Sequence, residues 1–152
     1  MLALLQRVTE ASVTVDADVV GAIELGLLVL VGVERGDGPR TAERMVERLT
    51  GYRVFEDAAG RMNLSVRDVG GSLLLVPQFT LPADTSKGMR PSFTPAAAPE
   101  QSRHLFDHLV SLAEATSVPV ERGRFGAHMR VALVNDGPVT FMLRVGQSAG
   151  PG

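Results

Sequence analysis

The chain of 152 residues contains no cysteine. This absence excludes disulfide bonds, thiolate metal ligands and a cysteine nucleophile, and it fits a cytoplasmic location. Long apolar runs are also lacking. The longest, residues 27–33, has the length of a strand and falls far below the roughly 20 residues of a membrane span. The apolar run that opens the chain is broken early by Gln6 and Arg7, so we expect neither a signal peptide nor contact with a membrane.

The chain also lacks an excess of positive charge. Its formal net charge is −2 and its pI is near 5.9, whereas a protein that binds nucleic acid without specificity is normally basic. A nucleic-acid ligand would therefore need a local basic patch. Candidates for phosphate contacts are Arg122, Arg124 and Arg130 near the end of the chain, with Lys87 and Arg90 in a long loop. The alternative is that all five are ordinary solvated surface residues.

What is present suits a single α+β domain. Apolar residues recur at helical spacing over residues 42–52, and a second helix is expected over residues 99–115. Continuous apolar runs at residues 27–33 and 72–76 indicate strands buried on both faces. We expect helices against a mostly antiparallel sheet in one domain of residues 1–145, followed by a disordered tail of residues 146–152.

Two prolines frame the segment Pro77-Gln78-Phe79-Thr80-Leu81-Pro82 at the end of a buried strand. Proline cannot donate to a strand ladder, so the backbone is expected to become irregular here. Thr80 is then the hydroxyl in the most unusual setting of the chain. Taken alone, Thr80 is better explained as a residue whose hydroxyl satisfies the backbone of a turn. The following residues 83–98 are expected to form a long loop, a kind of segment that is often functional.

The sequence Asn135-Asp136-Gly137-Pro138 separates two apolar segments, residues 130–134 and 139–145. Asp-Gly between two strands is a strong hairpin signal, and taken alone it predicts a plain hairpin turn. A proline after glycine can also be cis.

Several familiar catalytic patterns are missing. The chain has no Gly-rich phosphate loop and no Gly-x-Ser-x-Gly elbow. His104 and His108 have a spacing that can chelate zinc on a helix, but no Glu lies between them in the metalloprotease arrangement, and the flanking residues indicate a solvated face. We expect no metal and no cofactor. A Ser-His-Asp triad assembled from separate elements stays open.

Seven segments, taken in order, resemble the bacterial and eukaryotic D-aminoacyl-tRNA deacylase family over residues 1–145. They are QRV-ASV at 6–13, GLLVLVGVERGD at 26–37, FEDAAGRMNLSVRDVGG at 55–71, QFTL at 78–81, ADT-KG-RPSFT at 83–94, GRFGAHM at 123–129 and NDGPVT at 135–140. A single four-residue match would be weak, whereas seven in order over nearly the whole chain are very specific.

The resemblance implies a barrel-like sheet with two main helices and a homodimer that acts on the acceptor end of aminoacyl-tRNA. The implied reaction hydrolyses the ester of D-aminoacyl-tRNA, and of glycyl-tRNA mischarged on tRNA-Ala, releasing amino acid and tRNA. It also implies that Gly137-Pro138 is cis, enters the partner's active site and rejects L-amino acids, because an L side chain would meet its main chain.

The resemblance further suggests which residues form the site. Backbone N–H groups of Phe79 and Thr80 are candidate donors to the oxyanion. Thr80 is a nucleophile in one family mechanism; in the other, which we favour, the 2′-hydroxyl of the terminal adenosine activates water. The catalytic candidates are Gln78, Phe79 and Thr80, and the substrate-binding candidates are Gly137, Pro138, Met129, Phe125, Arg7 and Pro77.

The chain departs from the family pattern at three positions. Pro77 stands where the family usually has Ser, which removes a hydroxyl and an N–H from the pocket edge. Pro82 replaces a usual Tyr, and Met89 a usual basic residue.

Two other kinds of protein are alternatives to a D-specific enzyme. One is a tRNA deacylase with relaxed chirality, either the animal type or an archaeal threonyl-tRNA editing domain; Phe79 and NDGPVT argue against both. The other is a non-catalytic dimeric protein that binds tRNA ends.

Overall fold

A computed structural model describes residues 1–146, in which ten helices and strands are assigned; the tail predicted to be disordered lies almost wholly outside the described residues. No helix within residues 1–146 is both long and apolar enough to cross a membrane. The elements are β1 (Leu2–Val15), β2 (Asp18–Ile23), β3 (Gly26–Gly32), α1 (Pro39–Gly51), β4 (Phe55–Glu56), β5 (Met62–Leu64), β6 (Ser72–Pro77), α2 (Pro99–Glu114), β7 (Val120–Arg122) and β8 (Met129–Arg144).

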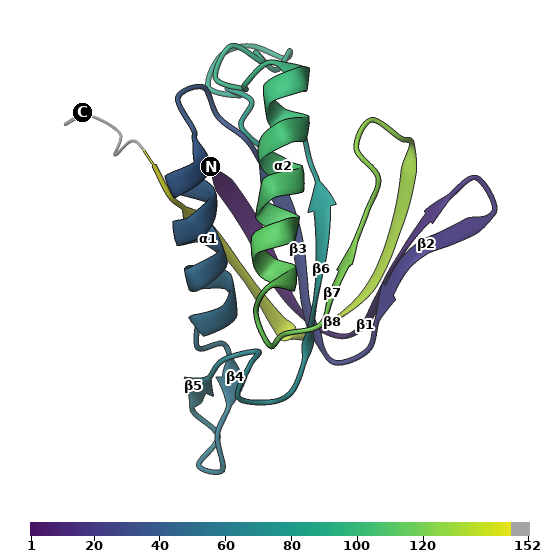
Figure 1. The fold of residues 1–152 in the computed structure, drawn as a ribbon, viewed down its shortest axis with the longest axis vertical. Helices are drawn as coiled ribbons and strands as arrows, with labels where there is room; N and C mark the ends of the chain where they lie inside the picture. The colour runs from purple at the N-terminus through teal and green to yellow at the C-terminus, as the bar shows by residue number, and fades with distance from the viewer. Residues whose placement is uncertain (147–152) are drawn as a thin grey trace.

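The main sheet is built around the long strand β1. Its path runs β2-β1-β3-β6-β7, and β8 pairs with β1 off this path. The pairs of β1 with β2, β3 and β8 are antiparallel, whereas β3 with β6 and β6 with β7 are parallel. The sheet is therefore mixed, with α1 and α2 side by side against one part of it (Figure 1). This confirms the predicted α+β fold with a mostly antiparallel, barrel-like sheet and two helices.

Two apolar clusters lie on opposite faces of this sheet. Successive side chains of a strand point to opposite faces, so a continuous apolar run supplies both. In β6, Leu73 and Leu75 join the cluster under the helices, whereas Leu74 and Val76 join the second cluster. In β3, Leu28 belongs to the second cluster as well. Burial on both faces explains why these two strands have no polar alternation.

The hairpin predicted at residues 135–138 is wrong. Residues 129–144 form the single strand β8, and both halves of it pair with β1: Met129 lies opposite Val15 and Arg144 opposite Leu2. The register shifts around Val8: residues 136–139 lie between the pairs Val8 with Asn135 and Gln6 with Thr140, and they form a bulge inside the strand. Asp-Gly favours a local turn, but the long partner strand β1 keeps the chain running in one direction on either side of it.

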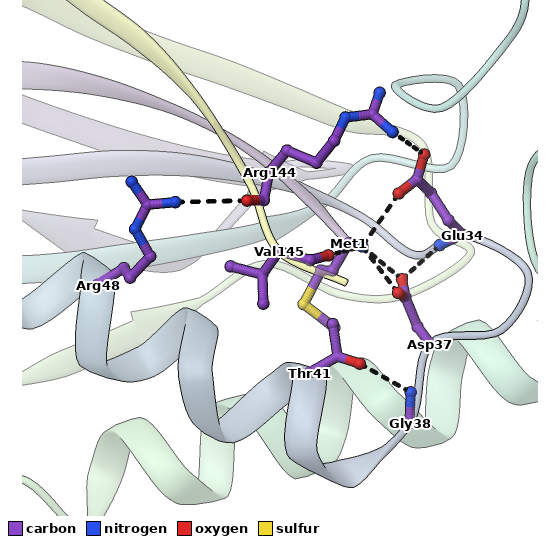
Figure 2. A network of polar contacts seen from close by, with 8 residues as sticks. All are labelled: Met1, Glu34, Asp37, Gly38, Thr41, Arg48, Arg144 and Val145. Atoms are coloured by element: carbon purple, nitrogen blue, oxygen red, sulfur yellow. Dashed lines mark hydrogen bonds and ion pairs between the residues drawn. The ribbon is translucent and has the colours of Figure 1, made fainter. Parts of the chain in front are cut away.

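The amino group of Met1 fastens the ends of β1 and β8 to the loop before α1 (Figure 2). It donates hydrogen bonds to the carboxylates of Asp37 (2.8 Å) and Glu34 (3.1 Å) and to the carbonyl of Val145 (2.6 Å). Arg144 pairs with the second oxygen of Glu34 at 2.9 Å. The side chains of Met1 and Asp37 are almost completely buried, so these ion pairs are largely shielded from solvent.

Candidate functional site

The carboxyl end of β6 exposes backbone donors. Gln78 still donates its N–H to the carbonyl of Val31 at 2.8 Å, and the strand ladder stops there. Within residues 1–146, neither the N–H of Phe79 nor that of Thr80 finds an acceptor, and both residues are exposed. Two adjacent free N–H groups at a strand end are suited to receive an oxygen that gains negative charge.

The Thr80 hydroxyl, which follows these donors, has an amide as its hydrogen-bond partner. The side-chain nitrogen of Gln78 donates to the Thr80 Oγ1. In the described part of the chain, no carboxylate or imidazole is hydrogen-bonded to this hydroxyl. Because an amide is not a base, the geometry lets Thr80 orient a ligand but supplies nothing to activate it as a nucleophile.

An aromatic pair stands beside the strand end. The rings of Phe79 and Phe93 are 5.4 Å apart with an interplanar angle of 31°, and each residue is 42% exposed. Phe93 belongs to the long loop, which is closed by paired backbone hydrogen bonds between Asp84 and Ser92. Within that loop, hydrogen bonds from the Ser86 hydroxyl and amide lower the pKa of the Asp84 carboxyl. The pair offers an apolar face next to the free donors.

Gly123 brings two of the predicted binding residues together. Its N–H donates to the carbonyl of Leu75 at 2.8 Å, which continues β7 alongside β6. A Cβ atom at position 123 would lie 2.9 Å from the Met129 sulfur and 3.4 Å from the Pro77 ring. Pro77 and Met129 therefore both lie against Gly123, and a side chain at this position would require the Met129 side chain to move. Phe125 follows, half-buried against the helical core.

Arg7 holds the bulge of β8 from inside the molecule. The residue is 7% exposed; its Nε donates to the carbonyl of Asp136 at 3.0 Å and its Nη1 to the carbonyl of Val54 at 2.8 Å. The Gly137-Pro138 peptide is cis, as the resemblance implied, and both residues are exposed. Gly137 has a φ of 134°, which side chains rarely tolerate. Arg7 thus stabilises, from the buried side, the exposed Gly137-Pro138 segment of the bulge, which we call the Gly137-Pro138 tip.

Asn135 closes the bulge, a role that sequence inspection missed. Its Oδ1 accepts the N–H of Val139 at 3.0 Å, and its Nδ2 donates to the Thr140 hydroxyl at 2.8 Å. Asn side chains commonly bond to backbone groups a few residues on, and this was the available signal. The bond from Asn135 to Val139 spans residues 136–138 and constrains the conformation of the Gly137-Pro138 segment.

The end of β6 and the Gly137-Pro138 bulge lie level with opposite ends of the ladder between β3 and β6. Pro77 is level with Val31, whereas Ser72 is level with Gly26, Val8 and, across β1, Asn135. The step from Ser72 to Pro77 corresponds to about 16 Å of strand at roughly 3.3 Å per residue. The structure therefore groups Pro77, Gln78, Phe79, Thr80 and Met129, and places Arg7, Gly137 and Pro138 elsewhere in the same chain.

The histidines form no metal centre with other residues. His104 is exposed and His108 is half-buried, with its Nε2 unpartnered. Among the residues that the structure describes, no group of three His, Asp or Glu side chains could hold an ion.

Comparison with solved structures defines the class of fold. A structure described as a probable eukaryotic D-amino acid tRNA deacylase covers 93% of this chain and 97% of its own, with a TM-score of 0.78 at 17% identity, so the two share a fold. A c-Myc DNA unwinding element binding protein is more similar, with a TM-score of 0.91 and 39% identity over 97% of this chain and 100% of its own.

The chain belongs to the D-Tyr-tRNA(Tyr) deacylase family, whose family model matches residues 4–144. A D-aminoacyl-tRNA deacylase of Thioalkalivibrio sulfidiphilus is 67% identical over 145 residues, covering 95% of this chain and 97% of the relative. One of Methylococcus capsulatus is 62% identical over 152 residues, covering 100% of this chain and 99% of the relative. These matches confirm the family named from the sequence motifs.

Proposed function

We propose that the protein hydrolyses the ester bond of D-aminoacyl-tRNA and releases the D-amino acid and tRNA. The observation that carries this is the pair of free N–H groups of Phe79 and Thr80 at the end of β6, in a chain of the deacylase family. We place the reaction in the cytoplasm, where charged tRNA is used, and assign it no cofactor.

The N–H groups of Phe79 and Thr80 receive the carbonyl oxygen of the ester as it becomes an oxyanion. The oxygen of a water molecule bonds to the carbonyl carbon, the bond to the ribose 3′ oxygen breaks, and that oxygen takes a proton. We assign activation of the water to the 2′-hydroxyl of the terminal adenosine. Within residues 1–146, the hydroxyl of Thr80 is hydrogen-bonded only to the side-chain amide of Gln78, which cannot act as a base. Loss of one oxyanion donor typically costs about 10²–10³ in rate.

The chiral filter is the Gly137-Pro138 tip of a partner subunit. An L side chain would point into the main chain of this tip and would be excluded, whereas a D side chain points away and glycine has none. Glycyl-tRNA, including that mischarged on tRNA-Ala, is then also a substrate. Because the filter lies on rigid backbone, the identity of the D side chain matters little.

The distance between the Gly137-Pro138 tip and the Phe79 and Thr80 donors of the same chain supports a site in which a second copy of the chain supplies the tip. The tip is about 16 Å of strand away from Pro77, so one subunit cannot bring its own tip to its own donors without breaking the sheet. The tip is exposed and held by Arg7 and Asn135, as a projecting element that enters another molecule must be. We therefore propose a homodimer with two reciprocal sites.

The other predicted residues have roles that follow from their places. Met129 and Pro77 line the pocket edge beside Gly123, and Phe125 supports it from the helical core. Gln78 orients the Thr80 hydroxyl.

The experiment follows free amino acid after incubation with D-Tyr-tRNA and Gly-tRNA. Hydrolysis of both is expected. Binding of tRNA without release of amino acid would instead identify a non-catalytic protein that binds tRNA ends.

Two changes separate the mechanisms. The Thr80→Ala variant is expected to keep activity within about tenfold of the parent, because other groups position the substrate. A substrate ending in 2′-deoxyadenosine is expected to be barely cleaved. A loss of many orders of magnitude in Thr80→Ala, with normal turnover of the deoxy substrate, would restore the nucleophile mechanism.

A further inference from the structure

A groove beside the candidate site contains three arginines among its seven lining residues. It has a volume of about 410 Å³ and lies between α2, Val20 of β2 and residues 122–125 at the end of β7. Arg103 and Asp107 come from α2, and Arg122, Arg124 and Phe125 from the other side. Of the five basic residues singled out from the sequence, Arg122 and Arg124 are here; Arg103 was not anticipated, because only the fold brings it to them.

The charges in this groove are unbalanced. Arg122 is paired with Asp107 at 2.8 Å. Within residues 1–146, no carboxylate lies within ion-pair distance of Arg103 or Arg124. Two positive charges therefore stay uncompensated in a chain whose formal net charge is −2. Such a local concentration of positive charge attracts an anion even though the whole molecule does not.

Aromatic rings hold two of the guanidinium groups in place. The Arg103 guanidinium carbon lies 5.1 Å from the centre of the Phe125 ring, and that of Arg122 lies 5.0 Å from the centre of the Phe106 ring. Stacking fixes the plane of a guanidinium group and can leave its N–H edge available to an oxyanion. Within residues 1–146, Arg103 donates no hydrogen bond, whereas Arg122 already donates to Asp107 and to the carbonyl of Gly123. Arginine held in this way is the side chain best suited to bind phosphate in an extended nucleic acid.

The groove adjoins the candidate site at Gly123. Gly123, which lines the groove, is also the residue on which Pro77 and Met129 converge. If the terminal ester of a tRNA occupied the candidate site, the preceding nucleotides would lie on the neighbouring surface. The groove with its three arginines is part of that surface.

We propose that the groove formed by Arg103, Arg122, Arg124 and Phe125 binds phosphate groups of the single-stranded acceptor end, just before the terminal adenosine. This inference rests on the proposed function. It explains how an acidic protein binds a polyanion: the contact is confined to a few oriented arginines next to the reacting ester.

The test compares two substrates that differ in phosphate. One is D-Tyr-tRNA; the other is the 3′-O-D-tyrosyl ester of adenosine, which has no phosphate. The variant Arg103→Gln/Arg124→Gln is expected to have a higher KM for D-Tyr-tRNA than the parent. Its loss of kcat/KM on D-Tyr-tRNA should be at least about tenfold larger than its loss on the adenosine ester. Arg61→Gln removes one positive charge from the exposed β4–β5 turn and is the control for the loss of a single arginine, as in Arg103→Gln or Arg124→Gln alone.

Salt dependence gives an independent readout. Each phosphate contact to a single strand contributes about −0.7 to the slope of log K against log salt, so two contacts contribute about −1.4. Between 50 and 200 mM salt, the parent is expected to lose about sevenfold more affinity for tRNA than the double variant. Arg103→Lys keeps the charge but not the stacked plane, and should fall between them.

The outcomes distinguish the two proposals. If the parent hydrolyses D-Tyr-tRNA and the double variant keeps the parent's kcat/KM and salt slope, the groove does not bind phosphate. An equal loss of kcat/KM on the tRNA and on the adenosine ester would also contradict phosphate binding by the groove, because it would indicate a structural effect on the site that holds the ester. If the parent hydrolyses neither substrate, it is the proposed function that fails.

Discussion

Replacing Arg7 with Met tests whether this buried arginine sets the position of the Gly137-Pro138 tip. Methionine keeps much of the apolar stem and removes the guanidinium group. Two backbone carbonyls then lose their donors: that of Val54, which is buried, and that of Asp136, which is only partly buried.

The magnitude follows from that difference in burial. A buried carbonyl left without a donor costs about 1–3 kcal/mol, and hydrogen bonds from charged groups lie at the upper end. Water can reach the carbonyl of Asp136, so its loss costs about 1 kcal/mol. We expect Arg7→Met to lower the free energy of unfolding by about 3–4 kcal/mol, less than the roughly 5–15 kcal/mol stability of a typical domain. The variant should therefore fold, with a tip that is less firmly held.

The assay combines urea unfolding with hydrolysis of D-Tyr-tRNA and L-Tyr-tRNA. Arg7→Met should discriminate less between the enantiomers, and Arg7→Lys should be intermediate because it keeps the charge but not the fork. Arg44→Met is the control: Arg44 pairs with Glu47 on the surface, both more than 60% exposed, and such pairs contribute about 0–1 kcal/mol. The reasoning is refuted if Arg7→Met costs less than about 1 kcal/mol and leaves the discrimination at the parent's value.

Three further outcomes are expected. Asn135→Ala removes the hydrogen bond to the Val139 N–H and should lower the free energy of unfolding by about 1–2 kcal/mol, with a parallel loss of discrimination between D- and L-Tyr-tRNA. Unaltered discrimination would show that the conformation of the bulge does not determine chiral selectivity. Asp37→Asn weakens the buried ion pair with the amino group of Met1 and should cost about 1–3 kcal/mol in urea unfolding, and an unchanged midpoint would show that the pair contributes nothing. Specific activity should fall on dilution together with dimer content measured by sedimentation, whereas a fully active monomer would exclude delivery of Gly137-Pro138 by a partner.

The sequence predicted strands wherever burial alone determines them. The apolar runs of β3 and β6 were recognised because only a strand covered on both faces needs no polar alternation. The end of β6 was equally predictable, since Pro77 and Pro82 remove ladder donors on either side of Thr80.

The arrangement around Gly137-Pro138 could not be predicted in this way. Asp-Gly signals a turn through local chemistry, but only pairing with β1 over its whole length shows that β8 continues past it. The hydrogen bond from Arg7 to the carbonyl of Asp136 could not be predicted for a related reason: the two residues are 129 positions apart in the chain, and no local sequence pattern connects them. The family resemblance indicated that the tip matters, and the structure adds what holds it.

The ratio of kcat/KM for D-Tyr-tRNA to that for L-Tyr-tRNA, measured on the unaltered protein, tests the chiral filter most directly. A backbone tip that excludes L side chains should give a ratio of at least about 100, since a steric clash with main chain cannot be relieved by a side-chain rotation. A ratio near one, with both esters hydrolysed, would contradict a filter formed by Gly137-Pro138.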